Sequence, residues 1–82
     1  MRTIDAIYGD KKYLYEVDCY MSEDGSLENR EKFWNKKEAL KSGVLMSKKY
    51  PFVEVNKVLV QMNDGEIEDY ECFIEQVKVW RR

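Results

Sequence analysis

The 82-residue sequence contains no histidine, one proline and only two cysteines. Without histidine, the chain lacks the commonest general base and the commonest metal ligand of proteins. Cys19 and Cys72 are too few for a disulfide framework, and they lack the close spacing of a zinc site. We therefore expect two reduced thiols that lie in strands as small, half-buried hydrophobic side chains.

Long apolar runs and catalytic motifs are also absent. No run of apolar residues approaches the length that crosses a bilayer. The first residues, "MRTIDAIYGDKKY", do not have the pattern of a signal peptide, so we expect a cytoplasmic protein. The sequence contains no Gly-rich phosphate loop, nucleophile elbow or calcium loop. We predict that the protein is not an enzyme and has neither a cofactor nor a metal site.

The composition nevertheless suffices for a folded core. Hydrophobic residues make up 44% of the chain and aromatic residues 13%, which predicts one domain over residues 1–82 rather than a disordered chain. The net charge of −2 and the isoelectric point near 5.2 give no global field that favours nucleic acid or an anionic membrane.

Two Asp-Gly turns, "SEDGS" (22–26) and "NDGE" (63–66), separate alternating runs and predict two β-hairpins. In the first hairpin, a three-residue loop of residues 23–25 with Gly25 left-handed sets charges against opposite charges and apolar against apolar side chains. The pairs that this register predicts are Asp18 with Arg30, Glu16 with Lys32, Met21 with Leu27, and Tyr15 with Phe33.

The second hairpin allows two registers, and the residues do not choose between them. A three-residue loop pairs Lys57 with Glu71 and Val58 with Tyr70. A two-residue loop pairs Leu59 with Tyr70 and Met62 with Ile67.

One helix is predicted between the hairpins. Asn35 is a suitable N-cap, Glu38 follows three residues later as in a capping box, and Pro51 ends the run "KKEALKSGVLMSKKY". Gly43 allows a shorter helix as an alternative, because glycine inside a helix costs about 1 kcal/mol. At helical spacing, one stripe is predicted to face the sheet; it consists of Ala39, Gly43, Met46, Ser47 and Tyr50, with Leu40 and Val44 beside it.

These elements define the predicted fold. Residues 2–8, "RTIDAIY", read as a further strand that the turn "GDKK" (9–12) joins to the first hairpin. The order is therefore β-β-β-α-β-β. We predict an α+β protein with a mainly antiparallel sheet of about five strands and one helix packed on one face.

The segment "NDGEIEDYECFIE" (63–75) contains six carboxylates and no cation. One interpretation is a strand whose apolar side chains are packed and whose solvated acids discourage association of sheets. Another is a surface that binds a basic groove on another protein, with a tyrosine as its aromatic anchor. The residues of this predicted partner-binding surface are Glu66, Glu68, Asp69, Tyr70 and Glu71. Acid–base catalysis by paired carboxylates is a third and weaker interpretation.

A second candidate surface lies on the outer face of the helix. Leu45 projects away from the predicted stripe, among Lys41 and Lys48. Lysines around a leucine are compatible with an ordinary solvated face or with a protein interface. Lysines near plentiful aromatic residues also occur where single-stranded nucleic acid binds, although no RNP-type motif is present.

The whole-chain plan resembles that of small proteins encoded by phages and other mobile elements, including some anti-CRISPR proteins. The features that resemble them are the two Asp-Gly turns, the junction "FWNKKEAL" and the return "KKYPFVEV". The resemblance implies a protein that binds and blocks a nuclease complex of the host, with the acidic strand imitating a nucleic-acid backbone. It carries over no individual functional residue.

The sequence thus favours a small non-enzymatic protein-binding module, and the resemblance implies a phage-type inhibitor that occupies a basic surface. A nucleic-acid-binding domain that uses the helix lysines is the alternative. A structural domain that forms homodimers through a strand edge is a third hypothesis.

Overall fold

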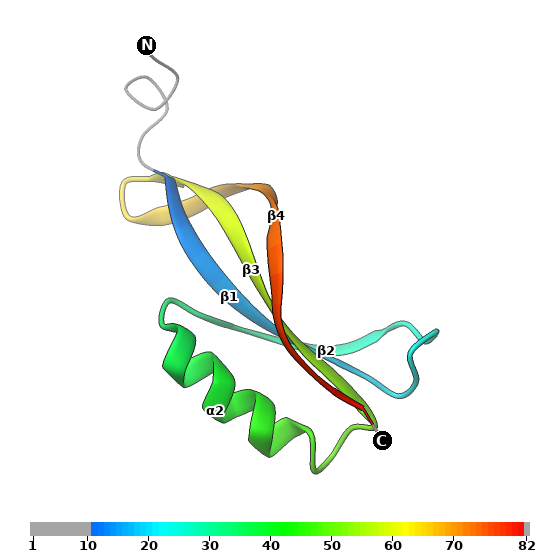
Figure 1. Cartoon of the computed structure of the whole chain (residues 1–82). Coiled ribbons are helices and arrows are strands. Elements are labelled where there is room, and N and C mark those ends of the chain that lie inside the picture. The colour runs from blue at the N-terminus through cyan, green and yellow to red at the C-terminus, as the bar shows by residue number, and fades with distance from the viewer. Residues whose placement is uncertain (1–10, 82) are drawn as a thin grey trace.

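The computed structural model of the protein describes residues 11–81, apart from the side chains of residues 69–71. This part contains β1 (Lys11–Tyr20), β2 (Leu27–Phe33), α2 (Lys36–Met46), β3 (Phe52–Asn63) and β4 (Glu66–Arg81). The strands form one curled sheet in the order β2-β1-β3-β4, and each of these pairings is antiparallel (Figure 1). The chain is therefore an α+β protein in which strands dominate.

The start of β1 differs from the prediction. The strand predicted at residues 2–8 lies outside the described residues. The turn predicted at residues 9–12 is wrong in its second half, because Lys11 and Lys12 belong to β1 and lie opposite Gln61 and Val60. The long strand β3 continues past the predicted start of β1, so its backbone provides partners for these two lysines.

The predicted register of the first hairpin is confirmed for Tyr15 with Phe33, Glu16 with Lys32 and Asp18 with Arg30. The pair of Met21 with Leu27 is wrong, because an irregularity after Cys19 shifts the register and sets Tyr20 opposite Leu27. Gly25 is not left-handed; instead, its amide donates a hydrogen bond of 3.1 Å to the carbonyl of Ser22. The charged pairs thus fix the register of the strands, but they do not fix the loop.

The second hairpin begins with the two-residue loop. Asp64 and Gly65 both have positive φ, 53° and 82°, as a type I′ turn requires, and Met62 lies opposite Ile67. The other predicted pairs do not form. The register shifts at four places, because β4 has 16 residues and β3 only 12. As a result, Leu59 lies opposite Cys72 and Val58 opposite Phe73.

The helix α2 begins as predicted and ends earlier. The Asn35 side chain accepts a hydrogen bond of 3.2 Å from the Glu38 amide, which satisfies one free donor of the first turn. Gly43 does not end the helix, which continues to Met46. Residues 47–49 form a turn instead of the predicted last helical turn, and the Tyr50 amide donates back to the Met46 carbonyl at 2.9 Å.

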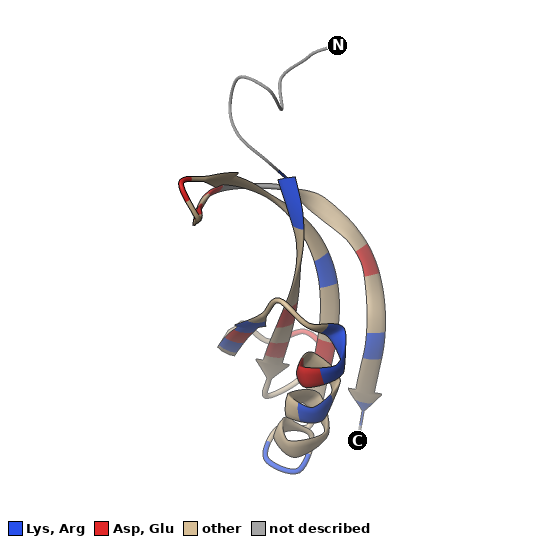
Figure 2. Ribbon diagram, turned by 90° about the vertical axis from the view of Figure 1, so that its left-hand side faces the viewer, with Lys and Arg blue, Asp and Glu red and all other residues tan. Residues whose placement is uncertain are grey.

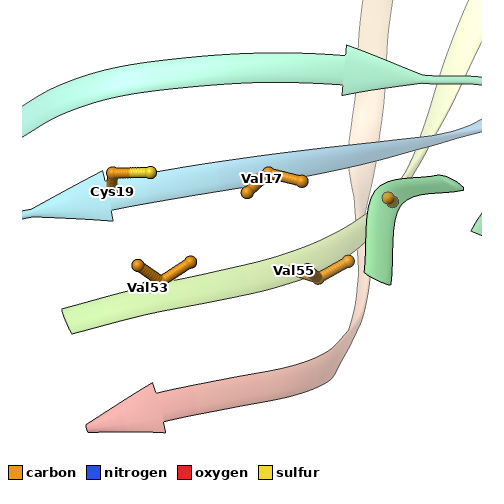
Figure 3. Close-up of a cluster of buried hydrophobic side chains, with 5 residues drawn as sticks. Val17, Cys19, Val53 and Val55 are labelled. Carbon is orange, nitrogen blue, oxygen red and sulfur yellow. The ribbon is translucent and has the colours of Figure 1, made fainter. Parts of the chain in front are cut away.

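The main core lies between α2 and one face of the sheet. Val17 and Cys19 of β1 lie opposite Val55 and Val53 of β3, and all four side chains are fully buried together with Ala39 of α2 (Figure 3). Of the predicted helical stripe, Ala39 and Gly43 are buried, and Leu40, Met46 and Tyr50 pack against the core. Val44 was predicted beside the stripe but is 46% exposed, so this prediction is wrong.

Gly43 allows the helix to approach the last strand closely. A Cβ atom at this position would lie 2.4 Å from two ring atoms of Trp80 and 3.2 Å from Cγ2 of Val55. The Trp80 ring therefore occupies the space that any larger residue would need. The requirement for this contact outweighs the helical cost of glycine.

The opposite face of the sheet carries a second, smaller cluster. Leu14, Val58, Val60 and Met62 are buried there, with Ile67 packed against them. Because neighbouring residues of a strand point to opposite faces, Glu16 and Asp18 of β1 also lie on this face, away from Val17 and Cys19. Among the residues that the structure describes, no helix is long and apolar enough to cross a membrane.

The contact between Gly43 and Trp80 predicts a coupling between the two positions. Gly43→Ala should destabilise the protein by about 1–2 kcal/mol, because the cost of overpacking exceeds the gain in helix propensity. In the background of Trp80→Leu, which removes the ring, the same substitution should be neutral or stabilising by up to about 1 kcal/mol. Urea unfolding of the four proteins measures this coupling. Equal effects in both backgrounds would show that the ring does not demand glycine.

Candidate functional site

Two regions of the chain each carry an excess of charge of one sign. Residues 34–50 carry five lysines against one glutamate, a net charge of +4, and residues 63–75 carry six carboxylates without a cation. The remaining residues are neutral in sum, with nine cations and nine anions. The β3–β4 turn, which belongs to the acidic segment, lies at one end of the sheet and α2 towards the other (Figures 1 and 2).

The structure describes two of the five residues of the predicted partner-binding surface in full. Glu66 and Glu68 lie at the start of β4 and are exposed, and Asn63 donates a long hydrogen bond of 3.5 Å to Glu68. The side chains of the other three, Asp69, Tyr70 and Glu71, lie outside the described part. Asp64 and Glu75, in the same acidic segment, are also exposed.

Of the described apolar side chains in the acidic segment, one is packed as predicted and three are exposed. Phe73 is 61% exposed and Ile74 is 39% exposed, whereas Ile67 packs against the second cluster. Phe73 lies opposite Val58 and Cys72 opposite Leu59, on the edge strand of the described sheet, where no further strand covers them. Sequence reasoning missed Phe73 because it expected all apolar side chains of this segment to be packed.

The two cysteines occupy different environments, and the prediction of two half-buried thiols is wrong for both. Cys19 is fully buried, and Cys72 is exposed on β4; neither forms a disulfide. Burial, followed by the charges of Glu31 and Asp18, raises the pKa of the Cys19 thiol to about 11. Cys19 is therefore an unreactive core residue, whereas the Cys72 thiol is accessible to solvent.

The second predicted surface is exposed, but it includes more than the helix. Lys41 and the 60% exposed Leu45 lie one helical turn apart on α2. Lys48 was predicted on the helix and lies instead in the turn after it, where its amide donates to the Leu45 carbonyl at 3.2 Å. Trp34, which sequence reasoning did not single out, is 53% exposed just before the N-cap. In the sequence, the polar residues "NKK" (35–37) that follow Trp34 were the only indication of its exposure.

We call the exposed lysines of this region the basic surface; they are Lys36, Lys37, Lys41, Lys48 and Lys49. Lys36 and Lys37 occupy the first turn of α2, where the helix macrodipole disfavours cations, and the last turn contains no basic residue. The stability of the helix therefore does not explain the position of these two lysines.

A buried polar network lies on the sheet face away from α2. Arg30 donates two hydrogen bonds to Asp18, of 2.7 and 3.2 Å, and Asp18 is only 2% exposed. Asn56 donates to both Asp18 and Glu54 at 3.2 Å, which links three strands. The hydrogen bond to Asp18 raises the pKa of Arg30 above its usual value, so this cation is firmly charged.

Further groups extend this network to the fourth strand. Gln76 of β4 donates a hydrogen bond of 2.8 Å to Glu54, and the Tyr20 hydroxyl donates a longer one of 3.4 Å. Burial, together with the charges of Asp18 and Glu54, raises the pKa of Tyr20. One oxygen of Glu16, Oε2, is buried without a hydrogen bond. The bonded side chains couple all four strands and support the fold.

No catalytic or metal centre emerges from this geometry within the described residues. No group of three or more acidic, cysteine or histidine side chains there is arranged to hold a metal ion. Comparisons with known proteins found no match to a family model, to a curated protein or to a solved structure.

The environments of the two thiols predict selective labelling. At pH 8, a thiol reagent should modify one cysteine of the native protein rapidly, and Cys72→Ser should abolish this fast reaction. The second thiol should react only after denaturation, because Cys19 is buried and protonated. Stopped-flow absorbance measures both phases. Rapid modification of Cys19 in the native Cys72→Ser protein would contradict the burial.

The network around Asp18 predicts a large loss of stability on truncation. Asp18→Ala should lower the free energy of unfolding by about 2–4 kcal/mol, because Arg30 and Asn56 lose their acceptor at a buried position. Glu28→Ala, which removes an exposed carboxylate of β2, serves as the control and should change stability by less than about 0.5 kcal/mol. Chemical denaturation measures both variants. Equal losses of stability in the two variants would show that the buried pair of Asp18 and Arg30 adds nothing to the free energy of unfolding.

Proposed function

We propose that the protein is a non-enzymatic binding module whose acidic segment docks onto a basic surface of another protein. The observation that carries this proposal is the exposure of Phe73 within a strand of exposed carboxylates. An apolar centre surrounded by polar side chains is the arrangement that protein interfaces use.

The electrostatic support comes from the concentration of charge. The protein as a whole carries only −2, but residues 63–75 carry −6 and include no compensating cation. Such a local field attracts a positively charged partner and orients it during the encounter. The attraction is short-ranged at physiological salt, where the Debye length is about 8 Å, so it acts at this surface rather than over the whole chain.

The apolar support comes from Phe73 and Ile74. Isolated exposed hydrophobic residues are common, but Phe73 and Ile74 are two large apolar side chains that are both exposed within the acidic segment. Aromatic side chains frequently dominate binding energy once a partner excludes water from them. In this proposal Phe73 supplies the anchor, and the exposed Glu66, Glu68 and Glu75 of the same segment supply the charge.

The geometry of β4 favours docking through side chains rather than addition of a strand. β4 is an edge strand of the described sheet, and its register shifts four times. Bulges interrupt the even row of backbone donors and acceptors that an added strand requires. This argues against the hypothesis of a homodimer paired through the edge of β4.

The resemblance to small phage-encoded proteins narrows the proposed partner to a nuclease complex. A groove that holds nucleic acid is lined with lysine and arginine, and a row of carboxylates can occupy it by imitating phosphates. On this proposal the protein blocks the complex by competing with its nucleic acid.

The proposal predicts that binding depends on the acidic segment. The tagged protein should capture a partner from a nuclease-treated extract of its source cells, and Glu66→Lys/Glu68→Lys should reduce that capture at least tenfold. Phe73→Ala should also reduce it, through loss of the anchor. Quantitative mass spectrometry of the captured proteins measures both effects.

Asp24→Lys/Glu28→Lys is the matched control, because it reverses two exposed carboxylates outside the acidic segment. The control should capture the same partner at the level of the unmodified protein. A captured set that is identical for all variants would contradict the proposed surface, and so would capture that requires intact nucleic acid.

A further inference from the structure

The geometry points to a second binding activity, at the basic surface. We propose that the basic surface binds single-stranded nucleic acid without sequence preference, with the phosphates on its lysines and an unpaired base on Trp34. This proposal is independent of the partner of the acidic segment, because it concerns α2 and its two flanking turns.

The first observation is that the lysines of the basic surface have no carboxylate partners. Arg30 forms an ion pair of 2.7 Å with Asp18, and Arg81 forms one of 2.7 Å with Glu23. None of the five lysines of the basic surface forms such a pair with a described residue. Their charges are therefore available to an external anion.

The second observation is the local excess of positive charge. Residues 34–50 carry a net charge of +4 in a chain whose total is −2, and Glu38 is their single acid. A polyanion neutralises several of these lysines at once, and it gains from the release of its own counterions. A single small anion has no such gain, so the charge complementarity selects a polymer.

The third observation is the exposure of a large aromatic ring beside this charge. Trp34 is 53% exposed, and Lys36 and Lys37 follow it after the N-cap. A base stacked on an aromatic side chain is a typical contact of single strands, because the bases of a duplex already stack on each other. The exposed Leu45 adds an apolar contact between Lys41 and Lys48.

The chemistry of the surface also indicates low sequence preference. All five cations are lysines, and residues 34–50 contain no arginine. Lysine contacts phosphate as a point charge, whereas arginine supplies the paired hydrogen bonds that recognise guanine edges. The surface thus matches the backbone of a strand rather than a particular sequence.

The test is fluorescence anisotropy of a labelled 12-nucleotide oligothymidylate with the full chain, at several salt concentrations. The slope of log affinity against log salt should be about −3, as expected for four phosphate contacts on a single strand. Trp34→Ala and Lys41→Glu should each weaken binding at least fivefold. Lys41→Glu should also make the slope less steep, by about 0.7 or more.

Lys12→Glu is the matched control, because it changes the net charge equally at an exposed lysine of β1. It should leave the affinity within about twofold of the unmodified protein. Equal weakening by Lys12→Glu and Lys41→Glu would overturn the assigned surface, and a slope near zero or no binding at 50 mM salt would overturn the activity.

Two further ligands test whether an acidic protein or a duplex binds this surface as well as a single strand does. Polyglutamate of equal charge should compete poorly, because it offers no base for Trp34, and a duplex of the same length should bind more weakly than the single strand. Competition by polyglutamate as effective as that by unlabelled oligothymidylate would assign the surface to acidic proteins instead. If the duplex bound as tightly as the single strand, stacking of an unpaired base on Trp34 would not contribute to binding.

Discussion

The contact of Trp80 with Gly43 is the interaction on which much of the remaining arrangement depends. It joins the last strand to the helix across the end of the main core, where Val55 also lies 3.2 Å from the position of a Cβ atom on Gly43. Trp80 reaches this place because it lies opposite Val53 in the sheet. If the register of the β3–β4 turn continued without shifts, Gln76 would lie there instead, and Trp80 would extend beyond the end of β3.

The four register shifts in β4 are therefore linked to the core at one end and to the acidic segment at the other. They bring Trp80 and Val77 to the helix side of the sheet, where both pack against the core. Phe73 and Ile74 lie between these two ends of the strand and are exposed. In the proposed function, these two side chains are the apolar groups that a partner covers.

Sequence reasoning succeeded where a local interaction decides the structure. The side chain of Asn35 caps its own helix, and the opposite charges of Asp18 and Arg30 select the register of the first hairpin. It failed where the deciding partner is distant in the chain. The register shifts of β4 and the contact of Trp80 with Gly43 join residues far apart in the chain, and the exposure of Phe73 and Cys72 on this strand was not predicted.

The candidate surfaces also contain some residues that the sequence predicted and others that it did not. Counting charges located the acidic segment and the lysines, and the structure places Glu66, Glu68, Lys41 and Lys48 in solvent. The apolar members of the surfaces were harder to predict: Leu45 follows from helical periodicity, but Phe73 and Trp34 do not follow from any periodicity. At physiological salt, screening over about 8 Å keeps the two charged regions electrostatically separate at opposite parts of the sheet. If both proposed activities hold, each region binds its own partner, and a complex that contains both a basic protein groove and an exposed strand of nucleic acid would engage the two regions at once.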